Sequence, residues 1–139
     1  MKIMRRVRAV CAALMALCLI AAPLCARADL TARFIDVGQG DSCLITCDGE
    51  SMIVDGGTAD NSSKLVALMN ALDVDELKYM VNTHPHDDHV GGLCGPLNKV
   101  RVDAAYSSTL DYDQNYFISY KRYAQKQGVS LGTLSAGDT

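Results

Sequence analysis

Basic residues are scarce in most of this sequence. The 139 residues contain 13 Lys and Arg against 16 Asp and Glu, which gives a formal net charge of −3. Five of the basic residues and none of the acidic ones lie in residues 1–28, so residues 29–139 hold 8 basic against 16 acidic side chains, a net charge of −8. This balance excludes a surface that binds nucleic acid by positive charge alone.

Internal repeats, low-complexity linkers and apolar runs of membrane-spanning length are also missing. The longest uninterrupted apolar run covers residues 9–22 and has 14 residues, short of the roughly 20 that a bilayer span needs. It follows a basic start and precedes Pro23 and the small-residue site Ala26-Arg27-Ala28, so it has the three regions of a secretory signal. The sequence predicts a signal peptide over residues 1–28, cleaved near Ala28. The product would be secreted or extracytoplasmic without a stable membrane anchor; a retained anchor is the alternative.

Cysteine is less abundant than the total of six suggests, because three of the six lie in the predicted signal peptide. The remaining Cys43, Cys47 and Cys94 are an odd number, which excludes a complete intrachain disulfide framework. Cys43 and Cys47 are four residues apart in an apolar stretch, so we expect both on one face of a strand as buried core thiols. A bridge between Cys47 and Cys94, or to a missing partner, stays open in an oxidising compartment.

Apolar stretches between turn residues predict that three short antiparallel strands open the domain. The first covers residues 30–37 and stops at the turn signal Gly38-Gln39-Gly40-Asp41. The second and third cover residues 42–47 and 51–54, on either side of the hairpin dipeptide Asp48-Gly49.

Beyond residue 60 the apolar spacing becomes helical. A helix with Ser62 or Ser63 as its cap is predicted to pack against the sheet through Leu65, Leu68, Met69 and Leu72. Strands over residues 78–82 and 100–106 follow. A second helix, capped by Asp111 or Asp113, should run to Gln127 and stop at Gly128, with a half-buried packing stripe of Tyr116, Tyr120, Tyr123 and Ala124.

The chain has only three histidines, and all of them fall within six residues. His84 and His86 are two apart, so an extended backbone projects them to one side, where two imidazoles can bind one metal ion. Asp88 and His89 point elsewhere and can serve a second ion or a bound water. This clustering predicts a metal site on a loop after a strand.

Glycine and proline frame this histidine loop. Gly91 and Gly92 are expected to support the site, because they let the backbone approach it and begin a helix without obstruction. The alternatives are a solvated polar loop or a pH-sensitive histidine cluster. Both are disfavoured because neither needs Pro85 and the double glycine.

These residues match the signature His-x-His-x-Asp-His, and through it the sequence resembles the metallo-β-lactamase fold family. The segments Phe34-Ile-Asp-Val-Gly-Gln-Gly-Asp-Ser42 and Ile53-Val-Asp-Gly-Gly57 resemble the branch related to the hydrolase domain of ComEC/Rec2-type competence proteins. The resemblance implies an α+β fold, an αβ/βα sandwich of two similar halves. Because no histidine follows His89 and the sequence ends in turn residues, residues 29–139 are expected to be the N-terminal half only, a truncated domain.

The resemblance also implies roles for individual residues. His84 and His86 would ligate a first metal, and Asp88 and His89 a second, with Asp88 also acting on the nucleophilic water. Two divalent ions are implied in the full domain. Zinc is the preferred metal and manganese the alternative, because imidazole and carboxylate ligands suit both. Asp55 would support the metal loop by hydrogen bonding. The branch-specific turn residues would lie at the active-site edge, with plain turn chemistry as the alternative: Asp36, Gln39 and Asp41.

The predicted function is an exported metal-dependent hydrolase that attacks phosphodiester bonds with metal-activated water. Such a centre lowers the pKa of a bound water to about 7. The substrate would be a small molecule or a polymer, either nucleic acid or a cell-surface polymer. From the number of ligands we expect single-site metal binding and negligible turnover for these 139 residues. The alternatives are a non-catalytic secreted metal-binding or interaction fragment and a degraded reading frame.

Overall fold

A computed structural model describes residues 29–138 of the chain. They contain one six-stranded sheet in the order β1-β2-β3-β4-β5-β6. Its strands are β1 (Thr31–Phe34), β2 (Cys43–Cys47), β3 (Glu50–Val54), β4 (Glu76–Asn82), β5 (Arg101–Ser107) and β6 (Leu131–Thr133). The predicted signal peptide lies outside the described residues. Within residues 29–138, no helix has the length and apolar character that a membrane crossing needs.

The sheet changes from antiparallel to parallel at β3. Strands β1, β2 and β3 pair antiparallel, as expected, and β3 to β6 pair parallel. Asp48 and Gly49 form the β2–β3 turn with φ values of 51° and 84°, the positive pair that a tight two-residue hairpin needs. Parallel neighbours require longer crossovers, and here these contain helices. The C-terminal ends of β3, β4 and β5 therefore lie together, and polar residues follow or end each of these strands.

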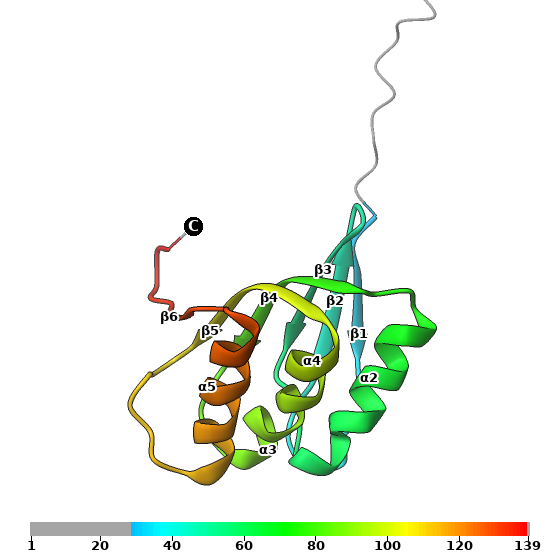
Figure 1. Ribbon diagram of the computed structural model, residues 1–139. Coiled ribbons are helices and arrows are strands. Elements are labelled where there is room, and N and C mark those ends of the chain that lie inside the picture. The colour runs from blue at the N-terminus through cyan, green and yellow to red at the C-terminus, as the bar shows by residue number, and fades with distance from the viewer. Residues whose placement is uncertain (1–28, 139) are drawn as a thin grey trace, which may run out of the picture.

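The crossovers form one helical layer. It contains α2 (Ser62–Ala71), α3 (Asp87–Val90), α4 (Cys94–Lys99) and α5 (Asn115–Gln127), with short 3-10 turns η1 (Ala59–Asn61) and η2 (Gly91–Leu93). Figure 1 shows α2, α4 and α5 side by side in front of the sheet. All four helices thus lie on the same side of the strands, and the short α3 lies near the strand ends.

The core fills the space between this helical layer and the sheet. Leu44, Ile53, Met80 and Ala105 are neighbours across β2 to β5, and all four are fully buried. The helices contribute Leu65, Met69, Phe117, Tyr120 and Ala124 to the same cluster. Burying a side chain of this size stabilises the fold by roughly 1.5–3 kcal/mol, so this one-sided core holds the sheet and the helices together.

The other face of the sheet is apolar, and no element of residues 29–138 covers it. Because alternate residues of a strand point to opposite faces, the row adjacent to the buried one lies on this second face. That row runs across β1 to β5 and has no fully buried member; Phe34 is 87% exposed. We call it the open sheet face and define it by Phe34, Cys43, Val54, Val81 and Tyr106.

The two cysteines of β2 are on this face, so the prediction of buried core thiols is wrong. Cys43 and Cys47 are only half-buried, because no element within residues 29–138 covers their side of the sheet. Cys94, in α4, is also half-buried. All three thiols are free, and no bridge joins Cys47 to Cys94.

The helix caps also differ from the prediction. Asn61, not Ser62 or Ser63, precedes α2, because η1 runs directly into the helix and the Ser62 amide donates to the Ala59 carbonyl. Gln114, not Asp111 or Asp113, precedes α5. Asp111 lies instead in a turn in which its backbone N–H donates to the Thr109 hydroxyl. Gly128 ends α5 as expected, with φ of 81°.

Predicted strands and helices appear where the patterns placed them, with changes in extent and burial. The first strand ends at Phe34 instead of residue 37, and the bend follows at residues 38–40. In α5 the buried residues are Phe117, Tyr120 and Ala124, whereas Tyr116 is 44% exposed. Helix α4 and strand β6 were not predicted, because each is shorter than a clear periodic pattern.

Candidate metal centre

The loop from β4 into α3 brings three potential metal ligands together. One ligand atom from each of His84, Asp88 and His89 lies within 4.8 Å of the others, and all three side chains are half-buried. The ring centroids of His84 and His89 are 3.8 Å apart. Two imidazole nitrogens and a carboxylate oxygen suit zinc or manganese, so these donors fit the divalent ion that the sequence implied.

His86 lies beside this group rather than in it. Its side chain is exposed, its ring centroid is 4.9 Å from that of His84, and its other neighbour is the Tyr112 ring at 6.1 Å. The expected pairing was His84 with His86, and Asp88 with His89. That assignment to two ions stays a prediction. The backbone turns into α3 immediately after His86, which brings Asp88 and His89 back toward His84.

Asp55 holds the histidine loop from behind, at the end of β3. Its carboxylate is buried and accepts hydrogen bonds from the Thr83 amide at 2.7 Å, the Thr83 hydroxyl at 2.5 Å and the Asn82 amide at 3.2 Å. Its Oδ2 is also 2.9 Å from Nδ1 of His89. With Nδ1 donating to Asp55, Nε2 of His89 is left to bind a metal, the arrangement that commonly orients ligating histidines.

The support extends one strand further, to residues that sequence reasoning missed. Asn82, at the end of β4, donates to the Asp55 carboxylate and to the His84 carbonyl at 2.7 Å. Its side-chain oxygen accepts a hydrogen bond from the Ser107 hydroxyl of β5 at 3.0 Å. Asn82 and Ser107 are both buried. Polar residues that end two neighbouring strands directly after apolar residues were the available signal.

Two of the three predicted edge residues lie at the centre. Gln39 donates to Oδ2 of Asp88 at 3.3 Å, and the Asp41 carboxylate is 4.0 Å from Nδ1 of His89. Asp36 instead shapes its own turn, accepting a hydrogen bond from the Gly38 amide. Desolvation raises the pKa of Asp88, but the Gln39 hydrogen bond, its backbone environment and the neighbouring histidines outweigh this and hold that pKa below its ordinary value.

Glycines allow the three loops of the centre to touch. A Cβ on Gly40 would lie 1.7 Å from the Asp88 carbonyl oxygen, and one on Gly92 would lie 1.9 Å from the Gly56 carbonyl oxygen. Gly91 is similarly close to Ala59. Gly91 and Gly92 begin the 3-10 helix η2, which runs directly into α4, and the short α3 precedes them.

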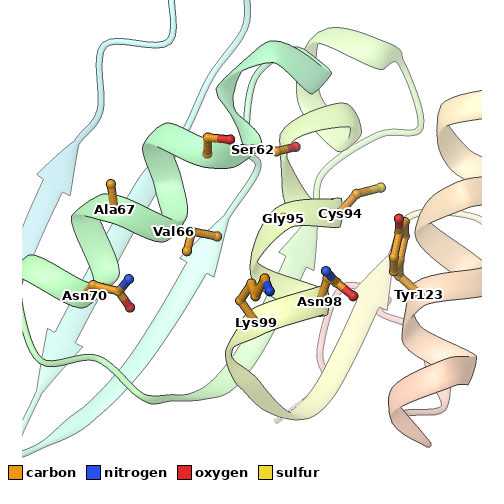
Figure 2. A pocket seen from close by; sticks show the side chains of 10 residues that line it. Ser62, Val66, Ala67, Asn70, Cys94, Gly95, Asn98, Lys99 and Tyr123 are labelled. Carbon is orange, nitrogen blue, oxygen red and sulfur yellow. The ribbon is translucent and has the colours of Figure 1, made fainter.

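A hollow of about 340 Å³ adjoins the candidate metal centre. Its lining includes His84, His89, Asp55 and Phe34. A separate groove of about 400 Å³ lies on the helical layer, between α2, α4 and α5 (Figure 2). Cys94 and Tyr123 line that groove, and burial raises the pKa of Cys94 to about 11. It contains none of the candidate ligands, so the chemistry lies at the strand ends.

The fold and this centre define an α+β domain with a divalent-metal site at the ends of its strands. Residues 35–137 match the family model of the metallo-beta-lactamase superfamily, and the chain belongs to that superfamily. Members of this superfamily are generally metal-dependent hydrolases. No curated protein matches the chain in sequence.

Solved metallo-beta-lactamases share the fold. SMB-1 in complex with mercaptoacetic acid aligns over 77% of this chain and 44% of its own, with 18% identity and a TM-score of 0.56. Rm3 aligns over 55% and 29%, with 25% identity and a TM-score of 0.48. MEM-A1, from a soil metagenome library, aligns over 56% and 30%, with 20% identity and a TM-score of 0.49. The chain thus spans less than half the length of these proteins, and the SMB-1 match confirms the expected α+β fold.

Proposed function

We propose that this chain belongs to an exported hydrolase that uses divalent metal to cleave phosphodiester bonds. One observation carries the proposal: the ligand atoms of His84, Asp88 and His89 converge within 4.8 Å. The Asp55 carboxylate, 2.9 Å behind His89, supports it, because a surface histidine cluster without a ligand would not need a buried acid to orient it.

The residues around the centre would have separate roles in such a reaction. A divalent ion held by His84, Asp88 and His89 would supply a water of lowered pKa and stabilise charge on the phosphoryl oxygens. Asp55 fixes the His89 ring, and Gln39 fixes the Asp88 carboxylate through its 3.3 Å hydrogen bond. His86 lies next to His84 and can contribute a further imidazole.

The choice of a phosphodiester rests on the sequence of the first turn and of the loop after β3. Residues 34–42 and 53–57 resemble the ComEC/Rec2-type branch, and both segments border the candidate metal centre. The net charge of −8 over residues 29–139 is compatible with an anionic substrate, because bound cations reverse the local potential. Export rests on the signal pattern of residues 1–28.

Metal titration of the purified full chain tests the proposal. We expect one Zn²⁺ or Mn²⁺ per chain by calorimetry, lost in His84→Ala and His89→Ala and weakened less in His86→Ala. The metal-loaded chain should bind bis(p-nitrophenyl) phosphate with negligible turnover, and it should not bind nitrocefin, a β-lactam. The exposed-acid variant Asp60→Asn is the control and should leave metal binding unchanged.

The outcomes separate the candidate functions. A chain that binds no metal, or binds nitrocefin in preference to the phosphodiester, would contradict the proposal. Metal binding without any phosphodiester binding would support the alternative, a secreted metal-binding fragment. That alternative draws on the same three-ligand group, which is sufficient for one ion.

A further inference from the structure

A third hollow lies beside the histidine loop. It has a volume of about 270 Å³ and is lined by His86, Asp87, Tyr112, Gln114 and Tyr116. His86 connects it to the candidate metal centre, since one neighbour of His86 is the His84 ring at 4.9 Å and another is the Tyr112 ring at 6.1 Å. A substrate group attached to a phosphate at the centre therefore reaches this hollow directly.

An aromatic wall is fixed on one side of the hollow. The Tyr112 ring contacts the Phe117 ring edge to face, with centroids 6.1 Å apart, and Phe117 is fully buried in the core. Lys121 of α5 donates to the Leu110 carbonyl at 3.1 Å, which ties the loop carrying Tyr112 to the helix. A ring held in this way offers a flat surface for another ring, at little cost in conformational entropy.

The polar groups of the hollow select against a second phosphate. The lining residues supply the hydroxyls of Tyr112 and Tyr116, the amide of Gln114, the imidazole of His86 and the carboxylate of Asp87, and no Lys or Arg is among them. Asp87 would repel an anion. The same carboxylate suits the hydroxyls of a sugar, as the acidic residue that binds ribose hydroxyls in dinucleotide sites illustrates.

The volume limits the size of the occupant. About 270 Å³ is just below the range of roughly 300–1,000 Å³ that is typical of pockets for drug-sized ligands. The hollow therefore has room for one ring unit. An aromatic surface, groups that hydrogen-bond to hydroxyls and a negative charge together suit a neutral sugar ring as the occupant.

We propose that this hollow is a sugar subsite, which binds the ring esterified to the phosphate on the His86 side of the metal centre. The inference rests on the proposed phosphodiesterase function and specifies its substrate: the unit on this side is a terminal sugar without a further phosphate. That sugar belongs either to a nucleoside or to a saccharide of a cell-surface polymer. Tyr112 and Asp87 are its specificity-determining residues.

Binding of three phosphate compounds to the zinc-loaded full chain tests this subsite. We expect uridine 5′-monophosphate or glucose 1-phosphate, or both, to bind severalfold more tightly than inorganic phosphate, because the sugar ring adds contacts with Tyr112 and Asp87. Tyr112→Ala and Asp87→Asn should remove that gain and leave inorganic phosphate binding unchanged. Tyr112→Phe should keep most of it, and Tyr79→Ala, a tyrosine on β4 outside the hollow, is the control.

A metal-free measurement makes the result independent of the metal centre. Uridine and methyl glucoside carry no phosphate, and binding of either should shift the NMR signals of the Tyr112 and Tyr116 rings without zinc. A stronger response to uridine assigns a nucleoside, and a stronger response to the glucoside assigns a saccharide. The subsite is overturned if neither compound shifts these signals, or if Tyr112→Ala leaves the binding gain intact while circular dichroism shows a folded chain. Loss of zinc binding with these shifts retained would overturn the hydrolase proposal alone.

Discussion

At the residue scale, Asp55 connects the backbone of β3 to the candidate metal ligands. It has a left-handed backbone conformation, with φ of 56°, which Asp and Asn tolerate better than most residues. This turn aims the carboxylate at Thr83 and His89 instead of into solvent. A residue outside the group of candidate ligands thus fixes the ligand geometry.

Replacing Asp55 by asparagine should weaken zinc binding about 10- to 100-fold, the usual effect of losing the group that orients a ligating histidine. Asparagine keeps the size and tolerates the positive φ, so the chain should remain folded. Calorimetric titration measures the affinity, and Asp73→Asn is the matched control, because Asp73 is exposed with φ of 54°. Unchanged affinity in a folded Asp55→Asn chain would contradict this role.

Gly40 permits the first turn to contact the histidine loop. In Gly40→Ala the new methyl group would meet the Asp88 carbonyl oxygen at 1.7 Å, so the two loops must move apart. Gly38→Ala is the matched control, since it also has a positive φ but nothing lies within 4 Å of its Cβ. Both should lose about 1–2 kcal/mol from backbone strain, and Gly40→Ala should lose more and bind zinc less tightly. Urea unfolding and zinc titration measure these two effects; equal losses would show that the contact is unimportant.

At the element scale, one side chain of α5 joins three elements. Gln127 donates to the carbonyls of Leu97 and Val100 at 2.8 Å and accepts from the Val102 amide at 2.7 Å. These contacts connect the end of α5 to the end of α4 and the start of β5. They anchor the helical layer at the N-terminal end of β5, which is the end opposite to the metal centre.

Gln127→Ala should lower the free energy of unfolding by about 1–3 kcal/mol, because it leaves buried backbone groups unpaired. Gln125→Ala, the same change at an exposed position of α5, should alter it by less than about 0.5 kcal/mol. Urea denaturation of the two variants provides the comparison. Similar unfolding midpoints would mean that water replaces the Gln127 contacts without cost.

At the scale of the whole molecule, residues 29–138 cover the sheet on one side only. The open sheet face spans five strands, and its most exposed member, Phe34, also borders the hollow at the metal centre. Apolar patches that extend over several strands are unusual on soluble monomers. They mark surfaces that bind another protein or self-associate. The solved relatives are more than twice as long as the part of them that this chain matches.

Charging the open sheet face should reduce its exposed apolar character. Tyr79 lies beside this face, since its ring centroid is 6.3 Å from that of Tyr106 and it is two residues before Val81 on β4. The double variant Phe34→Glu and Tyr79→Lys is expected to bind the dye ANS several-fold less than the unaltered chain and to self-associate less in sedimentation. Leu110→Glu removes a comparably exposed apolar side chain from the β5–α5 loop and serves as control. Equal ANS fluorescence in all three proteins would indicate that the face is not accessible in solution.

The local features of the fold follow from the sequence because their causes are local. Asp48-Gly49 predicts the hairpin, and Gly128 predicts the end of α5, through backbone preferences of one or two residues. The burial of Cys43 could not be predicted in the same way. Its burial depends on whether another layer covers that face of β2. The sequence of an apolar strand does not reveal this, because the same residue types occur on covered and uncovered faces.

The sequence by itself determined that three histidines and an aspartate share one loop, that this loop follows a strand, and that residues 29–139 are acidic. Only the tertiary structure decided that His84 groups with Asp88 and His89, while His86 lies beside Tyr112. The turn into α3 after His86 causes this grouping. Only the tertiary structure also decided that Asp55 supports His89, and the physical reason is their distance along the chain. Asp55 and His89 are 34 residues apart, and only the parallel pairing of β3 with β4, stabilised by the buried core, brings the two strand ends together.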